Sequence, residues 1–266
     1  MDKISQALQQ IQHLNELAAK DCWINRIHPI SKLLVTLFYC ILVVSFDKYH
    51  FVSLLVMAIY PLIMYEIARI SILKTLYRLK ILLFFIALFG IFNPFFDEKP
   101  LIIIRDFVIT GGMVSMLTLL IKGIFSLLAS YLLIATTSIE GICYALKKLY
   151  CPKILVTQIL LLYRYIPLFL LEFKHTLEAY SLKTIQEHGI RFRTWGSLVG
   201  LILLRSLDRA NEVYQSMCIR GYRGEFYAFS TQKITGRDIA YLLIWAIVLL
   251  ILRFVSVSEI IGGFLI

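Results

Sequence analysis

The chain has 266 residues, of which 59% are hydrophobic and 17% are charged, whereas soluble domains have about 45–50% apolar and about 25% charged residues. Its formal net charge is +10, but the basic residues are interleaved with apolar runs and carry no nucleic-acid-binding motif. The composition excludes an ordinary soluble domain, argues against a nucleic-acid partner, and indicates a protein of the lipid bilayer whose positive charges set its orientation.

The first twenty residues are polar and predict a short amphipathic helix, whose apolar side chains form one stripe: Ile4, Leu8, Ile11 and Leu14. This segment lacks the apolar core of a signal peptide, and the break at His28-Pro29 ends it. We expect residues 1–31 to form an interfacial segment at the inner surface of the membrane.

Residues 32–137 contain four apolar runs that predict transmembrane helices, at about 33–46, 51–65, 81–96 and 113–137. The stretch 66–80 has four basic residues against one acidic residue, whereas the connection after the third run is balanced. The positive-inside rule therefore places 66–80 in the cytoplasm. Gly111-Gly112 predicts a break before the fourth run, after which the chain returns to the cytoplasm.

Residues 138–237 contain fourteen basic residues against seven acidic ones, and the same rule places this block in the cytoplasm. A last apolar run, at about 239–252 within the segment 238–266, predicts a C-terminal span. Several runs are shorter than the roughly 20 residues of a helical crossing, so we expect five spans, or six. The predicted fold class is all-α, a polytopic membrane protein with a cytoplasmic domain.

Two sets of apolar residues in the cytoplasmic block recur at helical spacing. They are Ile166, Leu170, Phe173, Leu177 and Tyr180, and then Leu203, Leu207, Ala210, Tyr214 and Met217. The opposite faces carry charged residues: Lys174, Glu178 and Lys183 on the first, and Arg205, Asp208, Arg209 and Glu212 on the second. These patterns predict two long amphipathic helices below the membrane.

The second of these helices has a clear end signal. Gly221 suits the left-handed residue that closes a helix, and Arg220 before it is well placed against the helix dipole. Arg209 and Arg220 are eleven residues apart, about three turns, so both project on nearly one face. A guanidinium at a helix tip can bind carboxylates or carbonyls of a partner, although Arg220-Gly221 taken alone is also what an ordinary helix cap looks like.

The sequence GIRFRTWGSLVG at 189–200, followed by LLRSLDRANEVYQSMCIRGY at 203–222, closely resembles the coupling region of the transmembrane (T) components of energy-coupling-factor (ECF) transporters. It is most similar to the Q subunit of the cobalt/nickel type. Supporting resemblances are spread along the chain: Ile27-His28-Pro29 with Lys32, Asn93-Pro94, and Tyr163-Arg164-Tyr165.

In that family two cytoplasmic helices end in short Ala-Arg-Gly-like motifs that insert into grooves of two ATPase subunits. The resemblance implies a second motif at Ile219, Arg220 and Gly221, with isoleucine where alanine is usual. It implies a weaker first motif from Ala179 to Lys183, with lysine in place of arginine and Thr184 in place of glycine. Lysine keeps the charge but lacks the planar guanidinium fork.

The resemblance also implies the partners and the role of the chain. It would be a non-catalytic coupling subunit in a bacterial or archaeal cell membrane, bound to two ABC-type ATPase subunits and to a separate substrate-specific membrane subunit. ATP and Mg would bind the ATPases, cobalt or nickel would bind the substrate-specific subunit, and this chain would hold no cofactor and no metal. An ECF coupling subunit for a vitamin stays open.

A secondary transporter and a membrane enzyme are the two alternative classes of function. A secondary transporter needs a polar site at the membrane midplane, where only Lys122 of the fourth run carries a charge, and snorkelling towards the outer headgroups is the favoured interpretation of that lysine. A membrane enzyme needs a cluster of catalytic side chains. The sequence has no Gly-rich phosphate loop, no metal-ligand spacing among its five histidines, and no C-x-x-C pair among its five cysteines.

Overall fold

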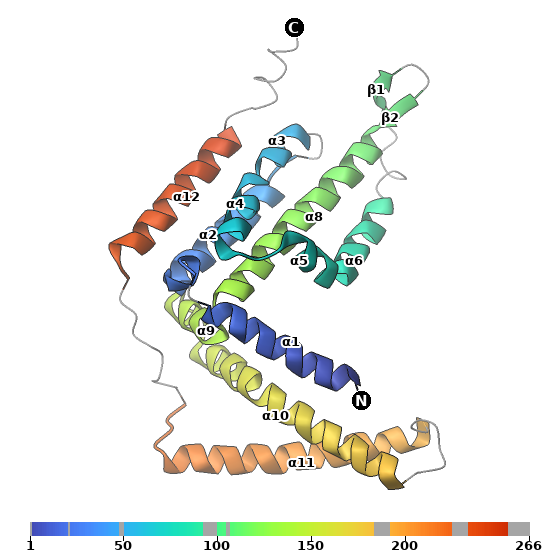
Figure 1. Ribbon diagram of the computed structural model, residues 1–266, viewed down its shortest axis with the longest axis vertical. Helices are drawn as coiled ribbons and strands as arrows, with labels where there is room; N and C mark the ends of the chain where they lie inside the picture. The colour runs from blue at the N-terminus through green and yellow to red at the C-terminus, as the bar shows by residue number, and fades with distance from the viewer. Residues whose placement is uncertain are drawn as a thin grey trace. The chain divides into compact units, whose positions relative to one another are not determined.

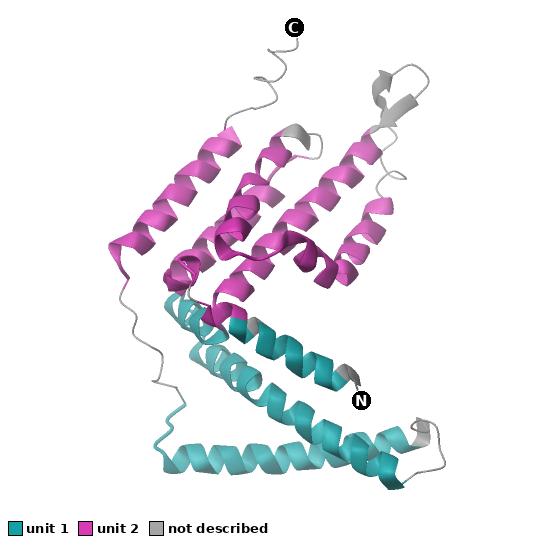
Figure 2. Cartoon of the chain, viewed as in Figure 1, with its two compact units in different colours: residues 1–16, 139–231 teal, residues 17–138, 232–266 magenta. Residues whose placement is uncertain are grey.

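The computed structural model describes residues 2–20, 22–47, 51–92, 100–104, 107–183, 192–224 and 234–254 (Figure 1). Nearly all of the described chain is helical, which confirms the predicted all-α class. The chain forms two compact units (Figure 2). Unit 1 comprises residues 1–16 and 139–231, and unit 2 comprises residues 17–138 and 232–266.

Unit 2 contains the apolar helices around its longest member, α8. Its elements are η1 (Ile24–Arg26), α2 (Pro29–Val44), α3 (Phe51–Val56), α4 (Ile59–Ala68), α5 (Ile72–Arg78), α6 (Lys80–Ile91), β1 (Pro100–Ile104), β2 (Phe107–Thr110), α8 (Gly111–Thr136) and α12 (Gly236–Phe254). Helix α8 packs against α2 to α6, and α12 packs against α2 (Figure 1). The close approach of α6 depends on Gly123, where an added Cβ would lie 2.8 Å from the Ile86 side chain.

The connection before α8 differs from the prediction. Strands β1 and β2 form an antiparallel hairpin that the sequence analysis did not anticipate. Gly111 and Gly112 do not break the chain but are the first two residues of α8. A helix start tolerates glycine because its first N–H groups have no partner within the helix, so α8 can begin at this pair.

Aromatic residues form the centre of unit 2. The rings of Tyr39 of α2 and Tyr60 of α4 lie 4.6 Å apart, and Trp245 of α12 meets Tyr60 edge to face at 4.8 Å. Pro61 leaves one backbone carbonyl without its helical partner, because proline has no N–H to donate to the carbonyl of Met57 one turn earlier. The Tyr39 hydroxyl donates to that carbonyl at 3.0 Å, so the break between α3 and α4 is satisfied by a neighbouring helix.

Lys122 does not extend freely towards headgroups, as favoured above, but binds the C-terminal end of α2. Its ammonium donates to the carbonyl of Val44 at 3.1 Å and to that of Phe46. Arg253 of α12 donates to the Ser45 carbonyl at 3.1 Å, and its guanidinium lies 4.0 Å from the Phe46 ring centre. Two cations thus meet the end of a helix, where carbonyls lack intrahelical partners and the dipole is negative.

Unit 1 contains most of α1 (Asp2–Ala19), with α9 (Ile139–Lys148), α10 (Lys153–Lys183) and α11 (Phe192–Ile219). Helix α1 confirms the helix predicted for the first twenty residues, and α10 and α11 confirm the two long helices. Helix α10 packs against both α9 and α11. The Tyr163 hydroxyl of α10 donates to the side chain of Asn15 in α1.

Helix length and hydropathy confirm a membrane protein but do not fix the number of spans. Helices α8, with 26 residues, and α10, with 31, are each long and apolar enough to cross a membrane. The pair 53–68 and 72–78, bent by 105°, makes a third candidate if the two helices form one span, while α2 and α6 are shorter apolar helices. Helix α10 belongs to the block predicted to be cytoplasmic, so its length and hydropathy were not expected to suit a membrane span. They do so because residues 154–171 contain one charged residue, Arg164. Five spans stay a prediction.

Candidate functional site

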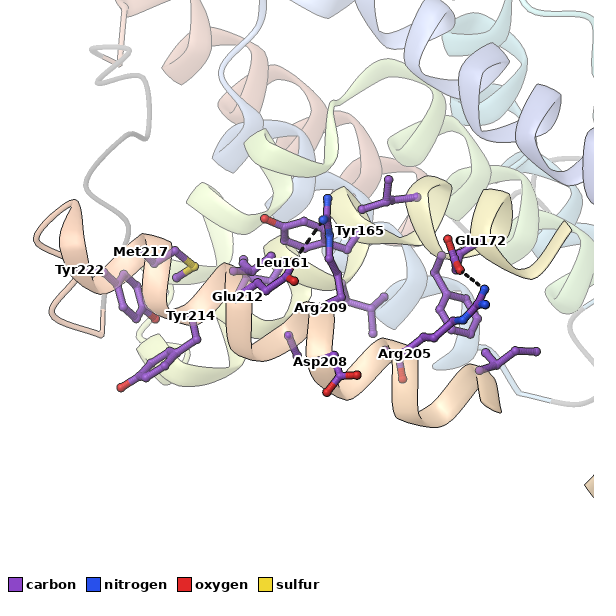
Figure 3. Close-up of a pocket in the computed structure, with 17 residues that line it drawn as sticks. Leu161, Tyr165, Glu172, Arg205, Asp208, Arg209, Glu212, Tyr214, Met217 and Tyr222 are labelled. Carbon is purple, nitrogen blue, oxygen red and sulfur yellow. Dashed lines mark hydrogen bonds and ion pairs between the residues drawn. The ribbon is translucent and has the colours of Figure 1, made fainter. Parts of the chain in front are cut away.

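Helices α10 and α11 enclose a groove of about 760 Å³ in unit 1 (Figure 3). Leu161, Tyr165 and Phe169 line it from α10, and Arg209 and Met217 line it from α11. The groove also reaches Tyr222, just beyond the end of α11. It therefore runs up to the segment that contains the candidate residues Arg220 and Gly221.

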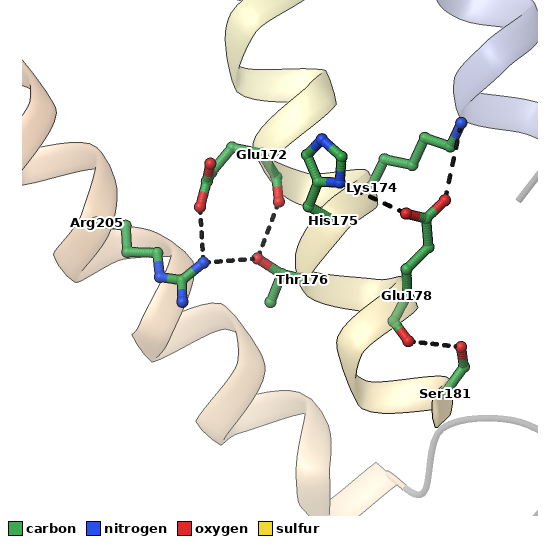
Figure 4. Close-up of polar contacts among 7 residues, drawn as sticks. All are labelled: Glu172, Lys174, His175, Thr176, Glu178, Ser181 and Arg205. Atoms are coloured by element: carbon green, nitrogen blue, oxygen red, sulfur yellow. Dashed lines mark hydrogen bonds and ion pairs between the residues drawn. The ribbon is translucent and has the colours of Figure 1, made fainter. Parts of the chain in front are cut away.

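One ion pair links α11 to α10 at the groove. Arg205 of α11 donates to the Glu172 carboxylate of α10 at 2.7 Å and also contacts the Thr176 hydroxyl at 3.5 Å (Figure 4). Thr176 is buried and donates to the Glu172 carbonyl at 2.9 Å. This contact fixes α11 against α10 at one place, and its position could not be read from either helix alone.

The groove is lined by residues from both predicted faces of α11, including Ala210, Tyr214 and Met217 of the apolar stripe. The charged residues expected on the face opposite the apolar stripe line the groove: Arg205, Asp208, Arg209 and Glu212. Three residues at or near the predicted stripe, Leu203, Leu204 and Leu207, are exposed. Arg205 pairs with Glu172 on α10, and Arg209 lies 3.4 Å from Glu212 within α11. Ile202 and Leu198 are instead the buried apolar residues of this helix.

The end of α11 has the predicted cap geometry. Gly221 has φ +80°, in the left-handed region. The Tyr222 N–H donates to the Met217 carbonyl at 3.0 Å, and the Gly221 N–H donates to the Cys218 carbonyl at 2.9 Å. This pair of bonds is the Schellman motif, which satisfies the last carbonyls of a helix. Arg220 and Ile219 are exposed at this end, the latter by 87%.

Gly221→Ala should loosen this tip. Left-handed backbone costs a residue with a Cβ roughly 1–2 kcal/mol, while the added methyl would meet nothing within 4 Å. The penalty is therefore conformational, and we expect faster hydrogen exchange at the amides of residues 221 and 222 in a folded protein. Gly224→Ala is the matched control, because Gly224 has φ +87° and equally open surroundings but closes no helix. Equal exchange in both variants would contradict the cap.

The first candidate tip is less defined. Helix α10 ends at Lys183, and both Ala179 and Lys183 are exposed. Lys174 and His175 approach the Glu178 carboxylate at 3.8 and 3.5 Å one turn earlier (Figure 4). Thr184 lies outside the described residues, as do Gly189 to Arg191 and Asn93-Pro94 of the resemblance.

The five cysteines are free thiols with different environments. Cys218 is exposed beside the tip, whereas Cys143 of α9 is buried. Burial, and secondly the charge of Glu140, raises the pKa of the Cys143 thiol above its usual range. Since the thiolate is the reactive form, we expect maleimide to label Cys218 at least about tenfold faster than Cys143. Peptide mapping by mass spectrometry measures both rates, with Cys218→Ser as control, and faster labelling of Cys143 would contradict the assignment.

Comparison with known proteins identifies the class as a membrane transport component. The family model of the cobalt transport protein CbiQ matches residues 20–231. The chain belongs to this CbiQ family, which confirms the family expected from the sequence.

Two related proteins show how far the sequence similarity extends along the chain. It is 28% identical over 103 residues to the nickel permease LarQ of Lactiplantibacillus plantarum, which covers 39% of this chain and 38% of that protein. It is 23% identical over 227 residues to an uncharacterized protein of Methanocaldococcus jannaschii, which covers 80% of this chain and 76% of that protein. The similarity to the nickel permease thus spans well under half of either protein.

Proposed function

We propose that the chain is the coupling subunit of an ECF-type importer, which links closure of two ABC-type ATPases to movement of a separate substrate-binding membrane subunit. The observation that carries this proposal is the tip of α11. A 28-residue helix ends in a fixed Schellman cap that leaves Arg220 and Ile219 exposed. A rigid helix with a guanidinium at its end can engage carboxylates or carbonyls of a partner in one geometry.

The exposed apolar surface of unit 1 supports a protein partner. Leu203, Leu204, Leu207 and Tyr214 of α11 are exposed, and exposed apolar patches of this kind mark interaction surfaces. We propose that this surface and the groove contact partner subunits, with Arg205, Asp208, Arg209 and Glu212 supporting the helix. The end of α10 at Ala179 and Lys183 would contact the second ATPase more weakly, because lysine lacks the fork of arginine.

The same proposal assigns the ligands of the transporter to its different subunits. ATP and Mg bind the ATPase subunits, the metal binds the substrate-specific subunit, and this chain lies in a bacterial or archaeal cell membrane as a multi-pass protein without a cofactor. Cobalt or nickel is the proposed substrate, since the matched family is that of cobalt transport proteins and one relative is a nickel permease. A vitamin is the alternative substrate. A secondary transporter is disfavoured because Lys122 is engaged by the carbonyls of Val44 and Phe46.

Co-expression tests the proposal. The tagged chain is produced with candidate ABC-type ATPase and substrate-binding subunits of the same organism, purified, and reconstituted in vesicles. We expect one complex and ATP-dependent uptake of radioactive cobalt or nickel, competed by the unlabelled metal and not by vitamins. Failure of every ATPase to co-purify would refute the coupling role, whereas uptake of a vitamin would correct the substrate alone.

A further inference from the structure

The chain passes between the two units at three places, after residues 16, 138 and 231. The first passage leads through η1 to His28 at the start of α2, the second follows the end of α8, and the third leads to the start of α12. Two buried side chains of unit 2 link these three helix ends: Asp238 binds the backbone N–H groups of His28 and Thr235, and Lys32 binds the backbone carbonyl of Thr136. These five residues are called the junction cluster.

Asp238 joins two of the three helix ends. One carboxylate oxygen accepts from the Thr235 N–H at 2.7 Å, which is one of the two bonds of a capping box, at the start of α12. The other oxygen accepts from the backbone N–H of His28 at 2.8 Å, immediately before α2. His28 in turn caps α2, because its Nδ1 accepts from the Ile30 N–H at 3.2 Å. One carboxylate therefore holds the starts of α2 and α12 together.

Lys32 adds the third helix end. Its side chain is 4% exposed, and its ammonium donates to the Thr136 carbonyl at the end of α8 at 2.7 Å. Asp238 is 5% exposed, and its negative charge stabilises the Lys32 ammonium against the cost of burial. Buried opposite charges of this kind depend on each other, because removal of one leaves the other uncompensated.

We infer that the junction cluster is the mechanical joint of the protein, with Lys32 and Asp238 as positioning residues. It ties the three chain passages to each other, so that a displacement of unit 1 reaches α2, α8 and α12 together rather than being absorbed by independent movement of each helix end. This inference rests on the proposed coupling function. A cluster that only stabilised the fold would affect assembly and would leave the ratio of uptake to ATP hydrolysis unchanged.

The test uses the complete transporter in vesicles and measures metal uptake and ATP hydrolysis in the same preparation. Lys32→Met is expected to leave the complex assembled and hydrolysing ATP but to lower uptake per ATP at least about fivefold. Lys32→Arg, which keeps the charge and the hydrogen bond, should restore the ratio. Asp238→Asn, which keeps the size and can still accept from His28, provides a second variant should Lys32→Met fail to fold, and it should also lower the ratio.

Lys122→Met is the matched control. Lys122 also donates to helix carbonyls, but at the C-terminal end of α2, away from the three passages. It should lower thermal stability and leave uptake per ATP unchanged. An unchanged ratio in Lys32→Met or in a folded Asp238→Asn, or an equal fall of the ratio in Lys122→Met, would overturn the inference. Absence of any ATPase from the wild-type complex would instead refute the coupling function itself.

Discussion

Arg220→Glu is expected to weaken binding of the partner ATPase at least about 30-fold, which corresponds to about 2 kcal/mol for removing one partner of a charged contact at an interface. Arg220 is exposed at the end of α11 in the free chain, so the loss would arise at the interface and not in the fold. A negative charge at a helix C-terminus costs about 0.3–1 kcal/mol, which a folded protein tolerates. Titration of the reconstituted chain with the purified ATPase dimer measures the affinity.

Arg223→Glu is the control for net charge. Arg223 is exposed two residues beyond Gly221 and outside α11, so this variant makes the same change in charge without altering the tip. It should bind the ATPase within about threefold of wild type, because isolated surface charges contribute about 0–1 kcal/mol. Lys183→Glu should have a smaller effect than Arg220→Glu. If Arg220→Glu and Lys183→Glu combined leave both assembly and transport unchanged, neither tip is a contact.

The features that local sequence determines could be predicted from the sequence. Helix α8 could be predicted from its long apolar run, and α10 and α11 from the helical spacing of their apolar residues. The cap at Gly221 could be predicted from a glycine at a helix end. The hairpin of β1 and β2 could also have been predicted, because its strands, PLIII and FVIT, are rich in the β-branched residues that favour strands.

The features that depend on distant partners could not be predicted. The pairing of Arg205 of α11 with Glu172 of α10 joins residues that are 33 positions apart. In the junction cluster, the His28 N–H and the Asp238 carboxylate are 210 residues apart. His28 and Lys32 were noted only as a family resemblance, and Asp238 had no signal of its own except its place three residues after Thr235. The spacing of residues in the sequence assigns a side chain to a helix face, but it does not identify the element that packs against that face.

Tyr60→Ala is expected to destabilise unit 2 by about 3–5 kcal/mol, the range for removing a buried aromatic ring. Tyr60 is 1% exposed, and its ring contacts Tyr39 of α2 and Trp245 of α12. The variant would therefore leave a cavity where α2, α4 and α12 meet. Thermal unfolding in detergent, followed by the loss of near-UV circular dichroism, measures the change.

Two control variants distinguish the stability contribution of the Tyr60 ring from that of its hydroxyl and from the general effect of shortening a side chain. Tyr60→Phe keeps both ring contacts and should cost less than about 2 kcal/mol, since it removes one hydrogen-bonding group. Leu62→Ala removes a side chain that is 54% exposed on the same helix, so little buried surface is lost and the midpoint should hardly move. A midpoint for Tyr60→Ala as high as that of Leu62→Ala would mean that the aromatic contacts do not hold α12 to the rest of unit 2. In that case the polar contacts at its two ends, those of Asp238 and Arg253, would be the main attachments of α12.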